Sequence, residues 1–433
     1  MCSFLFTNQK NFNLNEVNFL LQKRGPDETS ILEIEGYSYI HNLLSITGEF
    51  TKQPLIGNDL IILFNGEIYN YKDFGEYTSD GLCIAELFKD RNSDLLNKLD
   101  GEFAIFIHDK KNEEFILITD TFGTKPIYYS IEGDKISVSS YPDPIHKLEF
   151  RQVKKCEPNT ILSIDSKTLQ IKYKKKLYEF DLTQNKDSID DWHKAFMDSV
   201  LKRCKNTGHN FVVPLSSGYD SGLISHLLNI LSIDYISYSM KGRENYDVLT
   251  RRLSVNTNTN KEIISNLSAE DIQKVKNEMQ GNVQRFHYGP NPDEFMHDGF
   301  QDPGAIGLYY LLKKAKEKYG VKIAISGHGS DEIMSNVPEY GFKTSNPSYF
   351  TEDLNSIYPW GNFYYGSQWS YLMKEECVAG SLGIETRYPF LDRKVVQEYI
   401  NLVPHLKNKS YKYPIESMFG DYPFEKEKIG FGL

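Results

Sequence analysis

The sequence predicts two domains: an α+β domain rich in β-sheet, followed by an α/β domain with a parallel sheet. Residues 1 to about 180 contain short apolar runs of strand length, separated by turn residues such as Asn65-Gly66 and Phe122-Gly123. From residue 192 on, strand-like runs alternate with segments of helical periodicity, as in a parallel sheet with crossover helices. A polar, charged segment at 181–191 separates the two patterns, so we expect domains at 1–182 and 183–433.

The elements of the first region follow from local patterns. Strands are expected over 60–64, 103–107 and 115–118, which are runs of β-branched and aromatic residues. A helix fits 81–88, where apolar residues recur three and four positions apart. We expect sheets packed face to face, with helices outside.

Composition argues against several classes of function. The formal net charge of -10 gives no global field that would attract nucleic acid or an anionic membrane. The basic run Lys172 to Lys176 is expected to be a solvated strand face. No apolar run approaches the ~18 residues needed to span a bilayer. The five cysteines have no disulfide or metal-ligand spacing, and the N-terminus has no signal-like core, so we expect a cytoplasmic protein.

The most informative stretch of the second region is a strand, a small-residue loop and a helix over 211–228. Its loop reads Leu215-Ser216-Ser217-Gly218-Tyr219-Asp220-Ser221-Gly222, and helical spacing follows from residue 223. Such a loop points several backbone N–H groups at one spot beside a helix N-terminus, which suits phosphate. Gly218 permits a positive φ, and the carboxylate of Asp220 suggests Mg²⁺, since it would otherwise repel phosphate. An ordinary polar turn is the alternative.

A second loop of the same character follows the strand expected over 321–325. It reads Ser326-Gly327-His328-Gly329-Ser330-Asp331-Glu332. Two such loops at strand ends, each with an aspartate, could clamp Mg-pyrophosphate from both sides. A solvated turn is again the alternative.

Cys2 is the unusual residue of the first region. Removal of Met1 would give it a free α-amino group with a pKa near ~7.7–8.0, able to take the thiol proton. The alternative is a buried cysteine on a first strand.

Five features of the first region resemble, in order, the N-terminal-nucleophile glutaminase domain of the asparagine synthetase B family. They are Cys2, Arg-Gly-Pro-Asp at 24–27, Asn-Gly-Glu-Ile-Tyr-Asn-Tyr at 65–71, Leu-Asp-Gly-Glu-Phe-Ala at 99–104 and Phe-Gly-Thr-Lys-Pro-Ile-Tyr-Tyr at 122–129. The loop at 216–221 resembles the Ser-Gly-Gly-x-Asp-Ser loop of ATP pyrophosphatases, and 383–392 and 428–431 resemble later synthetase segments. The resemblance implies an αββα sandwich followed by an ATP-pyrophosphatase-type α/β domain.

The resemblance also implies substrates and roles. Glutamine is hydrolysed, and its ammonia passes through a channel to a carboxylate adenylated by Mg-ATP. The products are an amide, AMP, pyrophosphate and glutamate. In the glutaminase, Cys2 is the nucleophile, Asn65 and Gly66 form the oxyanion hole, and Arg24, Glu67 and Asp80 bind glutamine. In the synthetase, His328 and Lys412 are catalytic, Asp220 and Asp331 hold Mg²⁺, and ATP and pyrophosphate are bound by Leu215, Ser216, Ser217, Gly218, Asp220, Ser221, Met240, Ser326 and Gly327. Lys409 is the other candidate for the lysine, and a homodimer stays open.

Four departures from the family pattern qualify this interpretation. Ser217 stands where the family usually has its first glycine in the phosphate loop. Leu43 stands where the family has the arginine that binds the glutamine α-carboxylate, a loss of ~1.5–3 kcal/mol. His328 replaces a glutamate beside the acyl adenylate, and Ile333-Met334-Ser335-Asn336-Val337 replaces Leu-Phe-Gly-Gly-Tyr. The acceptor is therefore aspartate or another small or specialised carboxylate. Two alternatives stay open: a glutamine-independent ligase or cyclase of the β-lactam synthetase type, and a non-catalytic binding protein on this fold.

Overall fold

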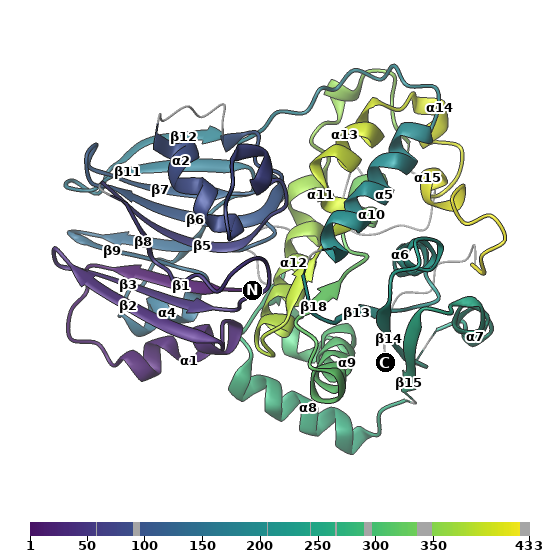
Figure 1. The fold of residues 1–433 in the computed structure, drawn as a ribbon, viewed down its shortest axis with the longest axis horizontal. Helices are drawn as coiled ribbons and strands as arrows, with labels where there is room; N and C mark the ends of the chain where they lie inside the picture. The colour runs from purple at the N-terminus through teal and green to yellow at the C-terminus, as the bar shows by residue number, and fades with distance from the viewer. Residues whose placement is uncertain are drawn as a thin grey trace. The chain divides into compact units, whose positions relative to one another are not determined.

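The chain folds into two compact units in a computed structural model (Figure 1). One unit comprises Met1–Glu179, Asn206–Gly208 and Gly380–Gly383, and the other comprises Phe180–Lys205, His209–Ala379 and Ile384–Leu433. The structure describes residues 1–57, 59–89, 96–205, 207–242, 244–264, 266–289, 297–335 and 349–424. Asn336, Val337 and the segment 428–431 lie outside these residues.

The first unit contains two six-stranded antiparallel sheets. In spatial order, the first sheet holds β10 (Lys154–Lys155), β8 (Tyr128–Glu132), β9 (Lys135–Ser139), β1 (Ser3–Thr7), β3 (Tyr37–Leu43) and β2 (Glu28–Ile34). The second holds β12 (Ile171–Lys176), β11 (Thr160–Asp165), β7 (Glu114–Thr119), β6 (Gly101–Asp109), β5 (Leu60–Ile68) and β4 (Leu55–Ile56).

The sheets pack face to face, with helices on their outer faces. Phe6 of β1 stacks on Phe106 of β6 with ring centroids 4.4 Å apart, inside a hydrophobic core to which both sheets contribute side chains. Helices α1 (Leu14–Arg24) and α4 (Pro142–Lys147) contact the first sheet, and α2 (Cys83–Lys89) joins the apolar cluster on the outside of the second. The predicted αββα sandwich is confirmed, including the helix expected over 81–88.

The turn predicted at Asn65-Gly66 is wrong. Both residues lie inside β5, where Asn65 pairs with Ala104 and Gly66 with Phe103 of β6. Gly66 has φ +138°, and a Cβ on it would lie 2.0 Å from the carbonyl oxygen of Glu102. The glycine is there because another backbone approaches closely, and not because the chain reverses.

The second unit is built on a five-stranded parallel sheet, which confirms the predicted α/β class. Its spatial order is β15 (Thr259–Ile264), β14 (Tyr235–Met240), β13 (Phe211–Pro214), β18 (Ile323–Ile325) and β19 (Glu385–Arg387). The longer helices are α5 (Asp190–Cys204), α6 (Tyr219–Ile230), α7 (Tyr246–Val255), α8 (Ala269–Asn282), α9 (Pro303–Tyr319), α12 (Gly366–Gly380) and α13 (Arg393–Asn401). Short elements are β16 (His287–Tyr288), β17 (His297–Asp298), α10 (Ser330–Met334), α11 (Gly361–Tyr364), α14 (Pro404–Lys407) and α15 (Tyr413–Glu416).

The strand order creates a switch point between β13 and β18. From β13 the chain adds β14 and β15 on one side, and later β18 and β19 on the other. In open parallel sheets, ligands bind outside the carboxyl ends of strands at such a point. The two small-residue loops leave the sheet at the carboxyl ends of β13 and β18, the two strands that flank this point.

The prediction of a solvated strand at Lys172 to Lys176 is also confirmed. Every residue of β12 is exposed, and Lys172 and Lys174 pair with Glu114 and Glu157, as expected of a solvated edge strand. All five cysteines are free thiols. Among the described residues, no helix combines the length and apolarity that a membrane crossing requires.

Candidate functional site

The loop after β13 is held in shape by its own serines. The Ser216 N–H donates to the Ser221 hydroxyl at 3.0 Å, the two hydroxyls share a 2.8 Å hydrogen bond, and the Gly218 N–H donates to the Ser216 hydroxyl at 3.1 Å. Helix α6 starts at Tyr219, so Asp220 and Ser221 lie in its first turn and not in a free loop. The arrangement places polar groups around a helix N-terminus, as the sequence predicts.

Gly218 does not adopt the positive φ that the sequence allowed. Its φ is −70° and its ψ is 172°, an extended conformation open to any residue. A Cβ there would lie 3.2 Å from the Ser216 hydroxyl. Glycine is therefore favoured at this position by close packing and not by a left-handed backbone.

The second loop packs directly against the first. Gly327 lies so close to α6 that a Cβ would come within 2.7 Å of the Asp220 Cβ and 2.9 Å of the Ser221 nitrogen. Gly329 has φ +98°, and α10 then starts at Ser330 and carries Asp331 in its first turn. The two aspartates are thereby brought to one place from segments more than a hundred residues apart.

Lys412 lies between these two aspartates. Its Nζ is 2.5 Å from Asp220 Oδ1 and 2.7 Å from Asp331 Oδ1, and it donates to the Ser330 hydroxyl at 2.8 Å. Desolvation lowers the pKa of this buried lysine, but the two carboxylates outweigh it and the net shift is upward. The ammonium therefore stays charged. Lys409 instead donates to the Tyr413 hydroxyl at the surface.

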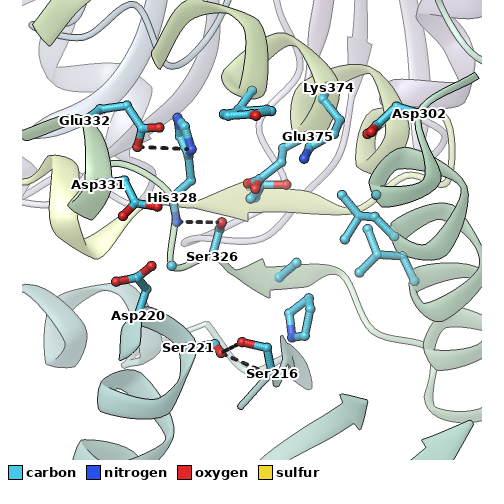
Figure 2. Close-up of a pocket in the computed structure, with 18 residues that line it drawn as sticks. Ser216, Asp220, Ser221, Asp302, Ser326, His328, Asp331, Glu332, Lys374 and Glu375 are labelled. Carbon is cyan, nitrogen blue, oxygen red and sulfur yellow. Dashed lines mark hydrogen bonds and ion pairs between the residues drawn. The ribbon is translucent and has the colours of Figure 1, made fainter. Parts of the chain in front are cut away.

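A cavity of about 300 Å³ opens beside this cluster (Figure 2). The two loops form one end, with Ser216, Asp220, Ser326 and Asp331 among its lining residues. Asp302, just before α9, and Lys374 and Glu375 of α12 line the other end. Leu215 and Met240 are buried and are not among the described residues of the lining.

His328 lies between the two ends of the cavity with both ring nitrogens near polar groups. Its Nε2 is 3.2 Å from Gln368 Nε2, and its Nδ1 is 3.7 Å from Glu332 Oε2. Because an amide nitrogen can only donate, the pairing with Gln368 places the imidazole proton on Nδ1, facing Glu332. In this pairing the lone pair of Nε2 accepts from the Gln368 amide, so Nε2 can take a proton from a substrate once that contact is exchanged.

Sequence reasoning missed Glu244, which binds the first loop from the side. Glu244 Oε2 accepts from the Ser217 N–H at 2.6 Å and also from the Ser217 hydroxyl. Arg252 holds the same loop by donating to the carbonyls of Ser216 and Gly218 at 2.8 and 2.7 Å. Neither residue belongs to a motif, and only the tertiary arrangement brings them to the loop.

Cys2 in the first unit is buried immediately before β1. Its thiol donates to the Leu44 carbonyl at 3.8 Å. Arg24 is completely buried, donates through Nε to the Cys2 carbonyl at 2.9 Å, and is not among the described residues that line the adjacent cavity. The arginine therefore fixes the backbone of the cysteine.

A small cavity of about 30 Å³ adjoins Cys2. Gly66, Glu67, Asp80 and Leu43 are among the residues that line it. The side-chain amide of Asn65 is fully buried, and neither its oxygen nor its nitrogen has a hydrogen-bond partner. An unpaired buried donor is what an oxyanion hole requires before substrate binds, although Asn65, unlike Gly66, is not among the described residues that line this cavity. The described lining includes Glu49, Glu67 and Asp80 but neither lysine nor arginine.

Two family models together match most of the chain. Residues 1–179 match a glutamine amidotransferase domain, and residues 191–375 match asparagine synthase. The chain is a divergent member of the glutamine-hydrolysing asparagine synthetase family.

Curated relatives in this family are similar over most of the chain, at low identity. A putative glutamine-hydrolyzing asparagine synthetase of Methanocaldococcus jannaschii is 27% identical, covering 87% of this chain and 72% of the relative. A probable one of Dictyostelium discoideum is 26% identical, covering 89% and 72%. A solved glutamine phosphoribosylpyrophosphate amidotransferase from B. subtilis aligns over 99% of this chain and 98% of its own, at 12% identity and a TM-score of 0.35.

Membership of the asparagine synthetase family defines the reaction class. The chain is a glutamine-hydrolysing, ATP-dependent carbon–nitrogen ligase whose substrates include glutamine and a carboxylate. The comparisons give no support to the alternative that uses no glutamine. Against the family pattern, Leu43 leaves the described lining of the Cys2 cavity without a cation, whereas Ser217 and His328 have polar partners in the synthetase unit.

Proposed function

We propose that this enzyme hydrolyses glutamine at Cys2 and uses the ammonia to amidate a carboxylate that it activates as an acyl adenylate. The glutaminase part is assigned to residues 1–182 and the synthetase part to 183–433. The five free cysteines are consistent with work in the reducing cytoplasm. A homodimer stays a prediction.

In the glutaminase step, the Cys2 sulfur attacks the side-chain amide carbon of glutamine. The α-amino group freed by removal of Met1 takes the thiol proton and then protonates the leaving ammonia. Asn65 and the Gly66 N–H stabilise the oxyanion, Asp80 and Glu67 bind the glutamine ammonium, and Arg24 positions the nucleophile through the Cys2 carbonyl. Water then releases glutamate from the thioester.

In the synthetase step, an oxygen of the acceptor carboxylate attacks the α-phosphorus of ATP, and pyrophosphate leaves. Ser216, Ser217, Gly218 and Ser221 with Ser326 and Gly327 bind the phosphates. Leu215 and Met240 are buried behind the described lining and support the nucleotide site from there. Lys412 balances the charge that develops on pyrophosphate. Ammonia then attacks the acyl carbon, AMP leaves, and Nε2 of His328 accepts the proton that the new amide must lose.

The donor set fits Mg²⁺. Asp220 and Asp331 converge on one point, now marked by the Lys412 ammonium, so a cation is already favoured there. Mg²⁺ characteristically binds one or two carboxylates and completes its shell with phosphate oxygens and water. Among the described residues, no group of three or more His, Cys, Asp or Glu could hold a metal ion. When bound, Mg²⁺ supplies charge neutralisation for the triphosphate.

The convergence of Asp220, Asp331 and Lys412 across Gly327 is the observation that carries this proposal. A version of the fold that only binds a ligand would have no need to hold a buried ammonium within 2.7 Å of each of two carboxylates. Such a cluster is costly to bury unless it is paired or used.

Substitution of Cys2 tests the proposal. Cys2→Ala should abolish pyrophosphate release supported by glutamine and keep release supported by ammonium, with Mg-ATP and a panel of carboxylates. Cys156→Ala, which removes a buried thiol of the sandwich core, is the matched control and should keep both. Glutamine-supported turnover in Cys2→Ala would refute the assigned nucleophile, and the absence of ATP-dependent turnover with every acid would refute the synthetase role.

A further inference from the structure

The carboxylates at the nucleotide end of the synthetase cavity all have partners. Asp220 and Asp331 are paired with Lys412. Glu332 accepts from the Ser367 hydroxyl at 3.0 Å and from the Gly329 N–H at 3.2 Å. Among the described residues, each of these carboxylates is therefore engaged, and the net charge that remains beside Lys412 suits the Mg²⁺ proposed for this end.

The opposite end of the cavity differs. Glu375 of α12 points into it (Figure 2), and its Oε2 is buried without a hydrogen-bond partner. Asp302, the second carboxylate here, is engaged through Oδ2 by the Tyr288 hydroxyl and the Ala305 N–H, both at 2.7 Å. Lys374 is the single lysine or arginine among the described lining residues, and its ammonium lies 4.5 Å from the centre of the Tyr371 ring.

A buried carboxylate oxygen with no partner is costly unless a ligand supplies a donor. The two carboxylates and one ammonium at this end give a formal charge of −1, which disfavours a second carboxylate on the acceptor and favours a cation. Leu308 and Leu312 line the same cavity and suit an aliphatic stem between the two polar ends of an acceptor.

We infer that the acceptor is a zwitterion: a carboxylic acid with a single carboxylate and a protonated amine, and that Glu375 binds the amine. The carboxylate then faces the nucleotide end, where it is adenylated, while the ammonium is held at α12. This inference rests on the proposed function for the adenylation step, but the recognition of the amine by Glu375 does not require turnover.

The test uses straight-chain ω-amino acids and the monocarboxylic and dicarboxylic acids of matching length, together with aspartate. Pyrophosphate release from Mg-ATP is measured with glutamine present, and products are identified by mass. The amino acids should exceed the matched monocarboxylic and dicarboxylic acids, and aspartate, in kcat/KM by roughly tenfold or more, the value of one charge-assisted pair.

Two substitutions of Glu375 make the assignment specific. Glu375→Gln should lower kcat/KM for the amino acid roughly tenfold while leaving the monocarboxylic acid unchanged, and Glu375→Lys should move the preference toward dicarboxylic acids. Glu270→Gln, an exposed position on α8, is the control. Preference for dicarboxylates or aspartate in the wild type, or an amine preference that survives Glu375→Gln, would overturn the inference.

A binding measurement separates this inference from the proposed function. If no acid supports pyrophosphate release, the function fails, yet the amino acids should still raise the melting temperature of the wild type more than the matched acids do. Glu375→Gln should lose that difference. Equal shifts for all acids in the wild type would overturn the recognition of an amine by Glu375.

Discussion

Replacing Glu244 by glutamine should tighten the binding of ATP. Glu244 Oε2 accepts two hydrogen bonds from Ser217, one from the backbone N–H at 2.6 Å and one from the hydroxyl. In the proposed site, that N–H is one of the groups that bind a phosphate oxygen. The carboxylate therefore occupies a position of the phosphate loop that the nucleotide needs, and ATP must displace it.

The size of the effect follows from the backbone contact alone, because this is the contact that a phosphate oxygen would replace. Hydrogen bonds to a charged acceptor contribute ~1.5–3 kcal/mol and those to a neutral one ~0.5–1.5 kcal/mol, so the amide weakens the contact by about 1–1.5 kcal/mol. The dissociation constant of ATP should fall by about fivefold to tenfold. Because burial raises the pKa of the Glu244 carboxyl, acidification should protonate it early and shrink the difference between the two proteins.

Titration calorimetry of Mg-ATP in the absence of acceptor measures this directly. Ser217→Gly removes the hydroxyl contact but keeps the backbone one, and should give a smaller gain in affinity. Glu270→Gln controls for the loss of one surface charge. Unchanged or weaker binding by Glu244→Gln would refute the reasoning, because Glu244 would then be supporting the loop and not competing with phosphate.

The other predictions concern the first unit. Leu43→Arg should lower the KM of the glutaminase for glutamine roughly tenfold or more by restoring a charge-assisted pair with the α-carboxylate; an unchanged KM would show that the carboxylate is bound elsewhere. His41 and His108 are buried and their pKa values are lowered to about 4, below the 6.5 of the unfolded chain. The native state should therefore lose up to ~3 kcal/mol per histidine as the pH falls from 6.5 toward 4, and His108→Gln should flatten this dependence in denaturant titrations, whereas an equally steep loss in the variant would contradict it.

Much of the fold could be predicted because its signals are local. The strand-like runs, the helix at 81–88 and the alternation after residue 192 each depend on a few neighbouring residues. Contacts between distant segments could not be predicted in this way. The Asn65-Gly66 pair has the composition of a turn but is placed inside β5 by pairing with β6, and α6 starts at Tyr219 because the Ser216 and Ser221 hydroxyls close the loop around it.

The same limit applies to the site. Cys2, Asp220, Asp331 and Lys412 could be named because they belong to motifs whose order the chain keeps. Glu244 and Glu375 belong to none, and each matters only through what it faces: Glu244 faces an N–H of the phosphate loop, and Glu375 faces the end of the cavity remote from that loop. A sequence pattern can identify residues that a family shares, but not those with which one member adjusts its specificity.

The departures from the family pattern differ in whether the surrounding residues offer the new side chain polar partners. Ser217 stands where the family has glycine, and Glu244 binds both its N–H and its hydroxyl; His328 replaces a glutamate, and Gln368 and Glu332 flank its ring. At Leu43 nothing replaces the missing arginine, because the described lining around Cys2 keeps its carboxylates and has no cation. A substitution whose new side chain has matched partners can change which ligand a site prefers. A substitution without such partners lowers the affinity of the site for its original ligand. We therefore expect the synthetase cavity to take an acceptor other than aspartate and glutamine binding to be the weaker half of the reaction. At low glutamine, the supply of ammonia should then limit the rate.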